Sequence, residues 1–307
     1  MKPYQNRIVV KVGTSTLTNE LGKSDLRCFD RLACVLSDIQ NMGYEVILVS
    51  SGAIAVGRNK LKMKTQPTSM RHKQAAAAVG QCSIMFLYDK FFGDYDKTIG
   101  QILLNAEDIE QEEKKDNLIN TFDALLEMGV IPIVNENDSV SYTEIESNDR
   151  LFGDNDMLSS VVAVLCRASK LVIFSDIDGF YNCDPRLHPD AKLIEEIDKI
   201  DDEVYKLAGG AGSRRGTGGM RTKLQAAALA TSQGIDTIIT NGKNPAALYD
   251  NNLTDYFLMI SGLAFVSPPT DFAPAYFAFR SSSSPKSRAL ALQTSTHAGF
   301  LPFLIRS

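Results

Sequence analysis

The sequence has no long hydrophobic run. The N-terminal stretch MKPYQNRIVVKVG contains only a short apolar segment before Lys11, and no later stretch reaches the length of a membrane-spanning helix. These absences argue against a signal peptide and a membrane anchor, so we expect a cytoplasmic location.

Cysteine and histidine are both scarce. The five cysteines are odd in number, widely spread and never arranged as CxxC, which argues against a zinc site and a disulfide framework. We therefore expect buried, reduced thiols. The three histidines, His72, His188 and His297, lie outside every glycine or carboxylate cluster. The sequence thus shows no Ser-His-Asp or Cys-His arrangement for nucleophilic catalysis.

An excess of basic residues is also missing, because the 307 residues carry a formal net charge of −5. A surface that binds duplex nucleic acid needs a basic excess to displace counterions, so wholesale nucleic-acid binding is unlikely on composition. Local positive groups must therefore meet any anionic ligand. The 44% hydrophobic and 22% charged content is typical of a globular protein with one large core or two modest ones.

Strand-like hydrophobic runs alternate with helix-like stretches along most of the chain. This alternation predicts an α/β fold, a three-layer α/β/α sandwich with a mainly parallel open sheet. The predicted strands are residues 8–12, 45–49, 99–104, 130–134, 171–174 and 237–240. The predicted helices are residues 26–39, 74–92, 118–128, 157–168 and 220–233. The first of them has an N-cap at Ser24 or Asp25 and a stop at Gly43.

The composition changes near Ser261. From Phe272 onward the chain has no Asp or Glu, and it contains the low-complexity stretch RSSSSPKSR. We therefore predict one domain over residues 1–260 and a divergent, poorly ordered tail over residues 261–307, which is too short for a core of its own. A basic arm that binds a partner is the alternative for this tail.

Polar, glycine-rich segments follow the predicted strands. Active sites of open parallel sheets lie at the carboxyl ends of the strands, so these segments are expected to meet at one edge. After the strands come KVGTST (11–16), SSGAIAVG (50–57), NEND (135–138) and SDIDG (175–179), and GDND (153–156) enters a helix. Gly13, Gly52 and Gly57 allow sharp turns, and a helix that begins just after Ser51 would point its positive end at an anion.

Lys11 ends an apolar strand, where an ammonium group is costly to bury unless it reaches an anion or solvent. A lysine that reaches out to solvent is one interpretation, but the following Gly-Thr-Ser favours an anion.

Carboxylates gather at neighbouring strand ends. Asp154 and Asp156 could serve simply as caps of the helix that begins near Asn155. Together with Asp138 and Asp176, they favour a site that holds lysines and Mg²⁺, a cation for which one or two protein oxygens suffice and no cage motif is expected.

The segment RRGTGGMRTK, residues 214–223, differs from a P-loop. Lys223 follows Thr222 instead of glycine, and no strand directly precedes the segment. Its glycines supply flexible backbone donors, and its lysine lies in the first turn of a predicted helix. We therefore predict a mobile phosphate lid, and leave open whether Arg214 and Arg215 bind phosphate.

These motifs, with DPR, occur in an order over residues 8–241 that closely resembles the glutamate 5-kinase group of the amino acid kinase family. Acetylglutamate kinases, aspartokinases and uridylate kinases share the fold and a lysine on the first strand but lack this combination. The resemblance implies transfer of the γ-phosphoryl group of ATP to the side-chain carboxylate of L-glutamate, with Mg²⁺. The product would be L-glutamyl 5-phosphate, made in the first step of proline biosynthesis.

The resemblance also implies roles for individual residues. Lys11 and Lys223 would contact the transferring phosphoryl group, and Asp156 would orient both lysines. The glutamate contacts would be Ser51, Gly52, Asp138, Asn155 and Asp154, with carboxylates for the α-ammonium and amide or hydroxyl donors for the α-carboxylate. The ATP contacts would be Lys11, Gly13, Ser175, Asp176, Thr217, Gly218, Gly219, Met220, Arg221, Thr222 and Lys223. No protein ligand of a metal is predicted.

The implied chemistry agrees with the residues. A carboxylate with a pKa of about 4.3 is ionised at neutral pH, so it needs no general base. The reaction instead needs charge neutralisation and in-line alignment, which two lysines can provide.

The chain departs from the family at residues 139–152, where the spacing between NEND and GDND is longer, and it shows no pattern of the PUA domain that many relatives append. The resemblance further implies inhibition by proline and a homo-oligomer, either dimer or tetramer. A kinase for another small acid and a non-catalytic amino-acid-sensing module remain as alternatives.

Overall fold

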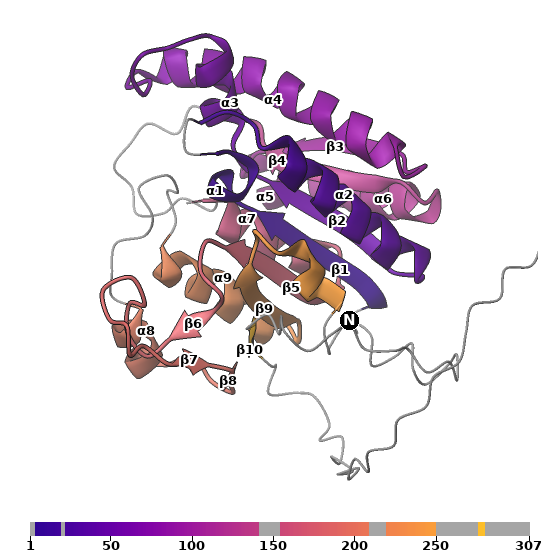
Figure 1. The fold of residues 1–307 in the computed structure, drawn as a ribbon. Helices are drawn as coiled ribbons and strands as arrows, with labels where there is room; N and C mark the ends of the chain where they lie inside the picture. The colour runs from indigo at the N-terminus through magenta and orange to yellow at the C-terminus, as the bar shows by residue number, and fades with distance from the viewer. Residues whose placement is uncertain (1–3, 20–21, 141–153, 209–218, 250–275, 280–307) are drawn as a thin grey trace, which may run out of the picture.

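The computed structural model describes residues 4–19, 22–140, 154–208, 219–249 and 276–279 (Figure 1). Its centre is a sheet with the strand order β3-β4-β2-β1-β5-β9-β10-β8. The first six strands in this order are all parallel: β3 (Ile99–Leu104), β4 (Ile131–Glu136), β2 (Glu45–Ser50), β1 (Tyr4–Val12), β5 (Ala168–Ser175) and β9 (Asp236–Asn241). β10 (Tyr276–Phe279) runs antiparallel to β9, and β8 (Glu196–Ile197) pairs in parallel with β10.

Helices cover both faces of this sheet (Figure 1). One layer contains α2 (Leu26–Asn41), α3 (Ala53–Lys60) and α4 (Met70–Gly93), and the other contains α6 (Glu112–Glu127), α7 (Asn155–Leu165) and α9 (Met220–Ser232). Strand β1 shows the resulting division of the core, because Ile8 and Val10 pack toward the first layer and Val9 toward the second. The predicted three-layer sandwich with a mainly parallel sheet is confirmed.

Shorter elements connect these layers. They are α1 (Thr14–Leu17), α5 (Glu107–Glu110), the two-stranded pair β6 (Phe180–Tyr181) and β7 (Leu193–Ile194), α8 (Asp202–Leu207) and a 3₁₀ helix over Pro245–Tyr249. Within the described ranges, none of the helices is both long and apolar enough to cross a membrane.

The observed ends of the helices can be compared with the start and stop signals in the sequence. Asp25 caps α2 as predicted, because its carboxylate accepts from the backbone N–H groups of Arg27 and Cys28 at 3.1 and 3.3 Å. The predicted helix over 157–168 is wrong at its C-terminal end, since α7 stops at Leu165. The cause is Arg167, whose φ of 52° breaks the helical path and allows the next residue to begin β5.

Helices α3 and α4 cross at two glycines. A methyl group on Gly57 would lie 1.7 Å from the carbonyl oxygen of Ala76, and one on Gly80 would lie 1.7 Å from that of Ala53. The two backbones are therefore in direct contact, and no larger side chain fits at either glycine. This contact fixes α3, and with it the loop that precedes α3, against the long helix α4.

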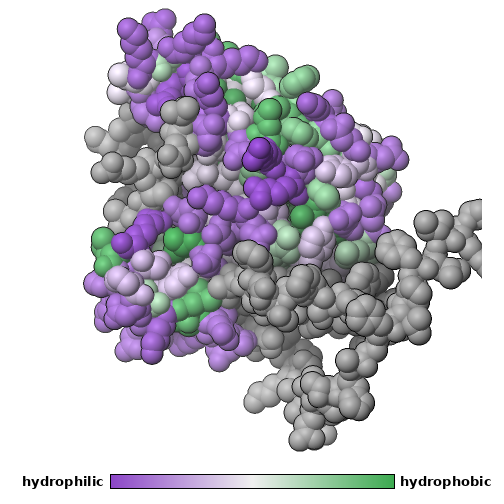
Figure 2. All heavy atoms as spheres, viewed as in Figure 1, coloured by the Kyte–Doolittle hydropathy of each residue, from purple (hydrophilic) through white to green (hydrophobic). Residues whose placement is uncertain are grey.

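Apolar side chains gather among hydrophilic ones over α4 and α2 on the face shown in Figure 2. Phe86 is 67% exposed and Leu26 is 51% exposed, and both line a groove of about 600 Å³. Val56 and Leu87 add further apolar walls to this groove. Polar residues, among them Asn59 and Lys60, line the rest of this groove.

All five cysteines are free thiols. Cys28 and Cys166 are buried as predicted, and burial raises the pKa of the Cys28 thiol to about 11. The expectation of burial is wrong for Cys82, which is exposed on α4. Of the predicted tail, residues 276–279 form β10, while the rest lies outside the described residues, so the division at residue 260 stays a prediction.

Candidate active site

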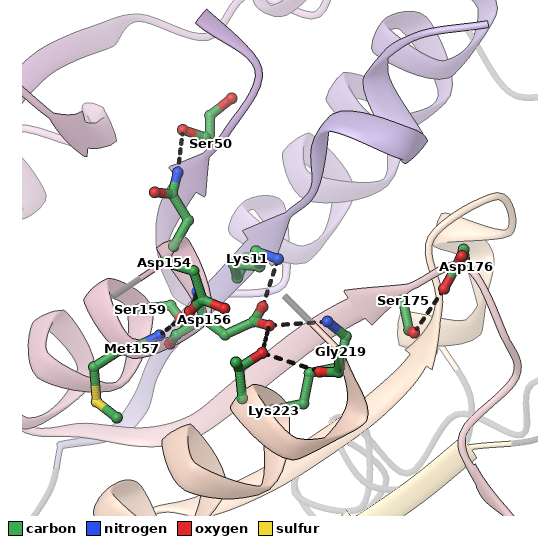
Figure 3. Close-up of polar contacts among 12 residues, drawn as sticks. Lys11, Ser50, Asp154, Asp156, Met157, Ser159, Ser175, Asp176, Gly219 and Lys223 are labelled. Atoms are coloured by element: carbon green, nitrogen blue, oxygen red, sulfur yellow. Dashed lines mark hydrogen bonds and ion pairs between the residues drawn. The ribbon is translucent and has the colours of Figure 1, made fainter. Parts of the chain in front are cut away.

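Lys11, Asp156 and Lys223 meet where the parallel strands end (Figure 3). Lys11 is two residues beyond Val9 on β1, so its side chain points to the face that α7 and α9 cover. Asp156 comes from the first turn of α7, and Lys223 from the first turn of α9. The Lys11 ammonium lies 2.5 Å from Oδ1 of Asp156, and the Lys223 ammonium donates to Oδ2 at 2.9 Å.

These three charged side chains are withdrawn from solvent. The side chain of Asp156 is 1% exposed, and those of Lys11 and Lys223 are 8% and 9% exposed. Burial of the carboxyl group opposes its ionisation, but the two ammonium groups outweigh this effect and hold the pKa of Asp156 well below its usual range. Asp156 is therefore a permanent anion, and the cluster carries one net positive charge.

Thr222 connects the start of α9 to the same carboxylate. Its hydroxyl lies 3.1 Å from Oδ2 of Asp156 and 2.9 Å from the carbonyl oxygen of Gly219, which precedes the helix. Gly219 provides no side-chain cap, so the first N–H groups of α9 are open to an anion at this end. Thr217 and Gly218, which were also predicted to bind ATP, lie outside the described residues.

Gly13 follows the end of β1 directly. A Cβ atom on this residue would lie 3.5 Å from the ammonium nitrogen of Lys11. The absence of a side chain therefore keeps the ammonium approachable from the loop that leads into α1. Within the described ranges no side chain caps α1, whose first backbone N–H groups follow Gly13.

The Ser51-Gly52 turn places the N-terminus of α3 at the same edge. The backbone N–H of Ser51 donates to the carbonyl oxygen of Val12 at 3.0 Å, which ties the ends of β2 and β1 together. Gly52 has a φ of 100°, a conformation that favours glycine, and no side chain caps α3. The turn therefore presents backbone donors suited to a carboxylate.

Asn155 is held by two hydrogen bonds from its amide nitrogen. Nδ2 donates to the carbonyl oxygen of Ser50 at 3.0 Å and to Oδ1 of Asn135 at 2.9 Å. Asn135, which is 3% exposed, in turn donates to Oε1 of Gln81 at 3.0 Å. These contacts join α7, β2, β4 and α4 at one point.

Asp154 and Asp138 supply further carboxylates. Oδ1 of Asp154 caps α7 by accepting from the backbone N–H groups of Asp156 and Met157. Its Oδ2 is buried and, within the described part of the chain, has no hydrogen-bond partner. Burial, with the nearby Glu136, raises the pKa of Asp138 to about 6.

Ser175 and Asp176 lie at the end of β5, to one side of the lysine cluster (Figure 3). The Ser175 hydroxyl lies 3.5 Å from Oδ1 of Asp176, and Arg186 donates to Oδ2 of Asp176 at 3.0 Å. Arg186 belongs to the DPR motif, but its contact with Asp176 was not predicted.

Sequence reasoning also missed two residues of α4. Gln81 bonds Asn135, and Tyr88 lies 2.9 Å from the hydroxyl of Ser50. Burial raises the pKa of Tyr88 far above its usual range, so its hydroxyl stays neutral and keeps its proton. The only signal in the sequence was their spacing of seven residues, which places them on one face of a helix.

Comparison with known proteins gives the following matches. The family model described as "Amino acid kinase family" matches residues 6–241 of this chain. The chain is 57% identical over 244 residues to the glutamate 5-kinase of Clostridium perfringens (strain 13 / Type A), covering 80% of this chain and 90% of that protein. It is 50% identical to the glutamate 5-kinase of Listeria monocytogenes serovar 1/2a, covering 80% of this chain and 88% of that protein.

Two solved structures share the fold. The isopentenyl phosphate kinase product complex of T. acidophilum has a TM-score of 0.55 at 16% identity, covering 80% of this chain and 94% of that one. The carbamate kinase from Giardia lamblia bound to AMP-PNP has a TM-score of 0.55 at 17% identity, covering 80% of this chain and 95% of that one.

Proposed function

This chain belongs to the amino acid kinase family, and from that premise we propose that it is a glutamate 5-kinase. It transfers the γ-phosphoryl group of ATP to the side-chain carboxylate of L-glutamate and forms L-glutamyl 5-phosphate and ADP, the first step of proline biosynthesis. One observation carries the proposal: Lys11 and Lys223 place two ammonium groups on one buried carboxylate at the open edge of the sheet.

The two lysines neutralise charge during the transfer. Each ammonium has three N–H donors, and Asp156 engages each through one carboxylate oxygen, so further donors remain for phosphate. A side-chain oxygen of glutamate attacks the γ-phosphorus while the bond from that phosphorus to the bridging oxygen of ADP breaks. Negative charge spreads over the transferring group, and fixed ammonium groups stabilise it without having to reorganise.

Asp156 acts as an orienting group and not as a base. Its low pKa makes it a poor proton acceptor, and both of its oxygens face ammonium groups. The attacking carboxylate is already ionised, so no proton has to be removed. The reaction therefore runs without the histidine chemistry that the sequence lacks.

The glutamate would lie between α3 and α7. Ser51 and Gly52 would donate to a substrate carboxylate from the uncapped start of α3. Asp138 and the free oxygen of Asp154 would accept from the α-ammonium.

ATP would lie over the C-terminal end of β5 and the N-terminal end of α9. Ser175, Asp176 and the residues from 217 to 223, with Lys11 and Gly13, are the proposed contacts. Mg²⁺ would come with the nucleotide and be held by its phosphate oxygens, where it neutralises phosphate charge.

The proposal extends to partners and location. We expect a homo-oligomer, dimer or tetramer, with proline as an inhibitor, in the cytoplasm. The groove beside Phe86 supports self-association, because its exposed apolar walls suit a second copy of the chain. Free cysteines agree with a reducing compartment.

The direct test is glutamate-dependent formation of ADP with Mg²⁺, with the acyl phosphate trapped by hydroxylamine as a hydroxamate. Glutamate should be the preferred acceptor in a panel with aspartate, acetylglutamate and UMP. Preference for another acceptor would identify a different small-acid kinase. Binding of glutamate without any turnover would identify a sensing module instead.

A further inference from the structure

We propose that Gln81 is a positioning residue that, through Asn135, helps to hold the side-chain carbonyl of Asn155 toward the α-ammonium of the substrate. This role makes Gln81 a determinant of specificity for free amino acids. The inference rests on the proposed function, because it assumes that an amino acid occupies the space beside Asn155.

The direction of this hydrogen-bond chain is fixed at one end by the backbone. The carbonyl oxygen of Ser50 can only accept, so the group of Asn155 that faces it must be the amide nitrogen. The same nitrogen then donates to Oδ1 of Asn135, which leaves the amide nitrogen of Asn135 to donate onward. Oε1 of Gln81 receives that last bond.

Both N–H donors of Asn155 are therefore committed to protein acceptors. The group that remains is Oδ1, and no residue in the described ranges donates to it. Asn155 thus offers an acceptor, which suits an ammonium and repels a carboxylate. This revises the expectation from sequence that the amide of Asn155 donates to the α-carboxylate.

An α-ammonium has three N–H donors and calls for three acceptors. Asp138 and Asp154 provide carboxylates, and Oδ1 of Asn155 completes the set. A neutral amide in the third place adds an acceptor without adding another charge to a site that must also admit the two carboxylates of glutamate.

Helix α4 is a rigid support for this arrangement. Gln81 directly follows Gly80, where α4 and α3 are in backbone contact. Tyr88, two turns further on, contacts the hydroxyl of Ser50, the residue whose carbonyl oxygen fixes the direction of the chain. The same helix face therefore holds both ends of the network.

The test compares Gln81→Met with Gln81→Glu in the full-length enzyme. Methionine removes the acceptor, so the buried Asn135 amide loses its partner and no longer holds its Oδ1 against Asn155, which keeps only its hydrogen bond to the Ser50 carbonyl. We expect the KM for glutamate to rise about 10-fold, as for one hydrogen bond that leaves a buried donor unpaired, with kcat and the KM for ATP nearly unchanged. Glutamate at position 81 keeps an acceptor oxygen and should restore the KM for glutamate.

Glutarate distinguishes this role from general damage, because it is glutamate without the α-amino group. Its inhibition constant against glutamate should be the same in wild type and Gln81→Met. An equal loss for glutamate and glutarate, or an unchanged KM for glutamate in Gln81→Met, would overturn the inference.

Gln40→Met is the matched control. Gln40 donates to the carbonyl oxygen of Gly129 at 2.9 Å, at the edge of the sheet where the strands begin. Loss of this bond should change neither the KM for glutamate nor the inhibition constant of glutarate. A wild-type enzyme without glutamate-dependent ADP formation would refute the proposed function itself. An active wild type with an unaffected Gln81→Met would refute only the role of Gln81.

Discussion

Lys11 and Lys223 bind opposite oxygens of Asp156, at 2.5 and 2.9 Å. Neither lysine can approach the other without this carboxylate, because two like charges in a buried site repel each other. The carboxylate therefore determines how far apart the two ammonium groups stand. That separation must suit a single transferring phosphoryl group if both lysines act on it.

Replacing Lys223 by alanine should lower kcat about 10² to 10³-fold, the range for loss of one group that stabilises charge in a transition state. Lys11→Met should have a similar effect. Steady-state ADP formation measures the loss, and circular dichroism checks the fold. Lys115→Ala is the control, because Lys115 pairs only with the exposed Glu112 on the surface of α6. Wild-type turnover in Lys223→Ala would rule out its catalytic role.

Asp156→Asn should destabilise the fold by about 3 to 5 kcal/mol, because it leaves two buried ammonium groups without a counter-charge. Urea unfolding at pH 7 measures the change. Asp176→Asn breaks a pair with the partly exposed Arg186 and should cost less than about 1 kcal/mol. Equal losses in the two variants would contradict the importance of burial at Asp156.

Activity should depend on pH through Asp138, whose pKa is raised to about 6 by burial and by Glu136. Only the ionised form attracts an α-ammonium, so kcat/KM for glutamate should fall as the pH drops below about 6. The carboxylates of free glutamate titrate at a lower pH, near 4.3 and below, which separates the two effects. Asp138→Asn should lower kcat/KM at neutral pH and remove this transition. A transition near pH 6 that survives in Asp138→Asn would assign it to another group.

Gly57→Ala should destabilise the protein by about 3 kcal/mol or more, because its methyl group would lie 1.7 Å from the carbonyl oxygen of Ala76. Any folded fraction should also bind glutamate more weakly, since α3 begins at the Ser51-Gly52 turn. Gly93→Ala is the matched control: among the described residues, no atom outside the neighbouring residues and the local helix backbone lies within 4 Å of its added methyl group, and alanine favours the helix. Thermal unfolding of both variants should show a large loss for the first and none for the second.

Phe86→Lys should weaken self-association by at least about 30-fold if the groove binds a second copy, because a charge would replace a central aromatic contact. Light scattering after size exclusion, over a range of concentrations, measures the change. Met128→Lys alters a residue that is 70% exposed away from the groove and should leave the mass unchanged. An unaltered mass in Phe86→Lys would place the interface elsewhere.

The sequence predicts the sheet and its functional edge well because both depend on short-range patterns. Apolar runs mark the strands, and the polar segments at the end of β1 and at the starts of α7 and α9 mark where Lys11, Asp156 and Lys223 come together. The end of α7 was predicted three residues too late, because the backbone turn at Arg167 leaves no pattern in hydrophobicity.

Contacts between distant elements were less predictable. Gln81 lies within α4 and belongs to none of the motifs in the sequence. Its role depends on which atom of Asn135 faces it, and that choice is made by a backbone carbonyl on β2. The orientation of an amide group is a tertiary property that no local pattern records. The resemblance to a known family implies which residues would bind substrate but not which of their atoms are free to do so.

Strand β1 carries a second buried cation, Arg7, near its other end. Arg7 is 3% exposed and contacts Glu45 at 2.6 Å, Asp123 at 2.8 Å and the carbonyl oxygen of Cys166 at 2.8 Å. Arg7 and Lys11 are four residue steps apart along an extended strand, which is about 13 Å at roughly 3.3 Å per residue. One strand thus joins a buried ion-pair anchor to the proposed phosphate site at Lys11. We expect the anchor to hold β1 in place while the charge at the proposed site changes during turnover.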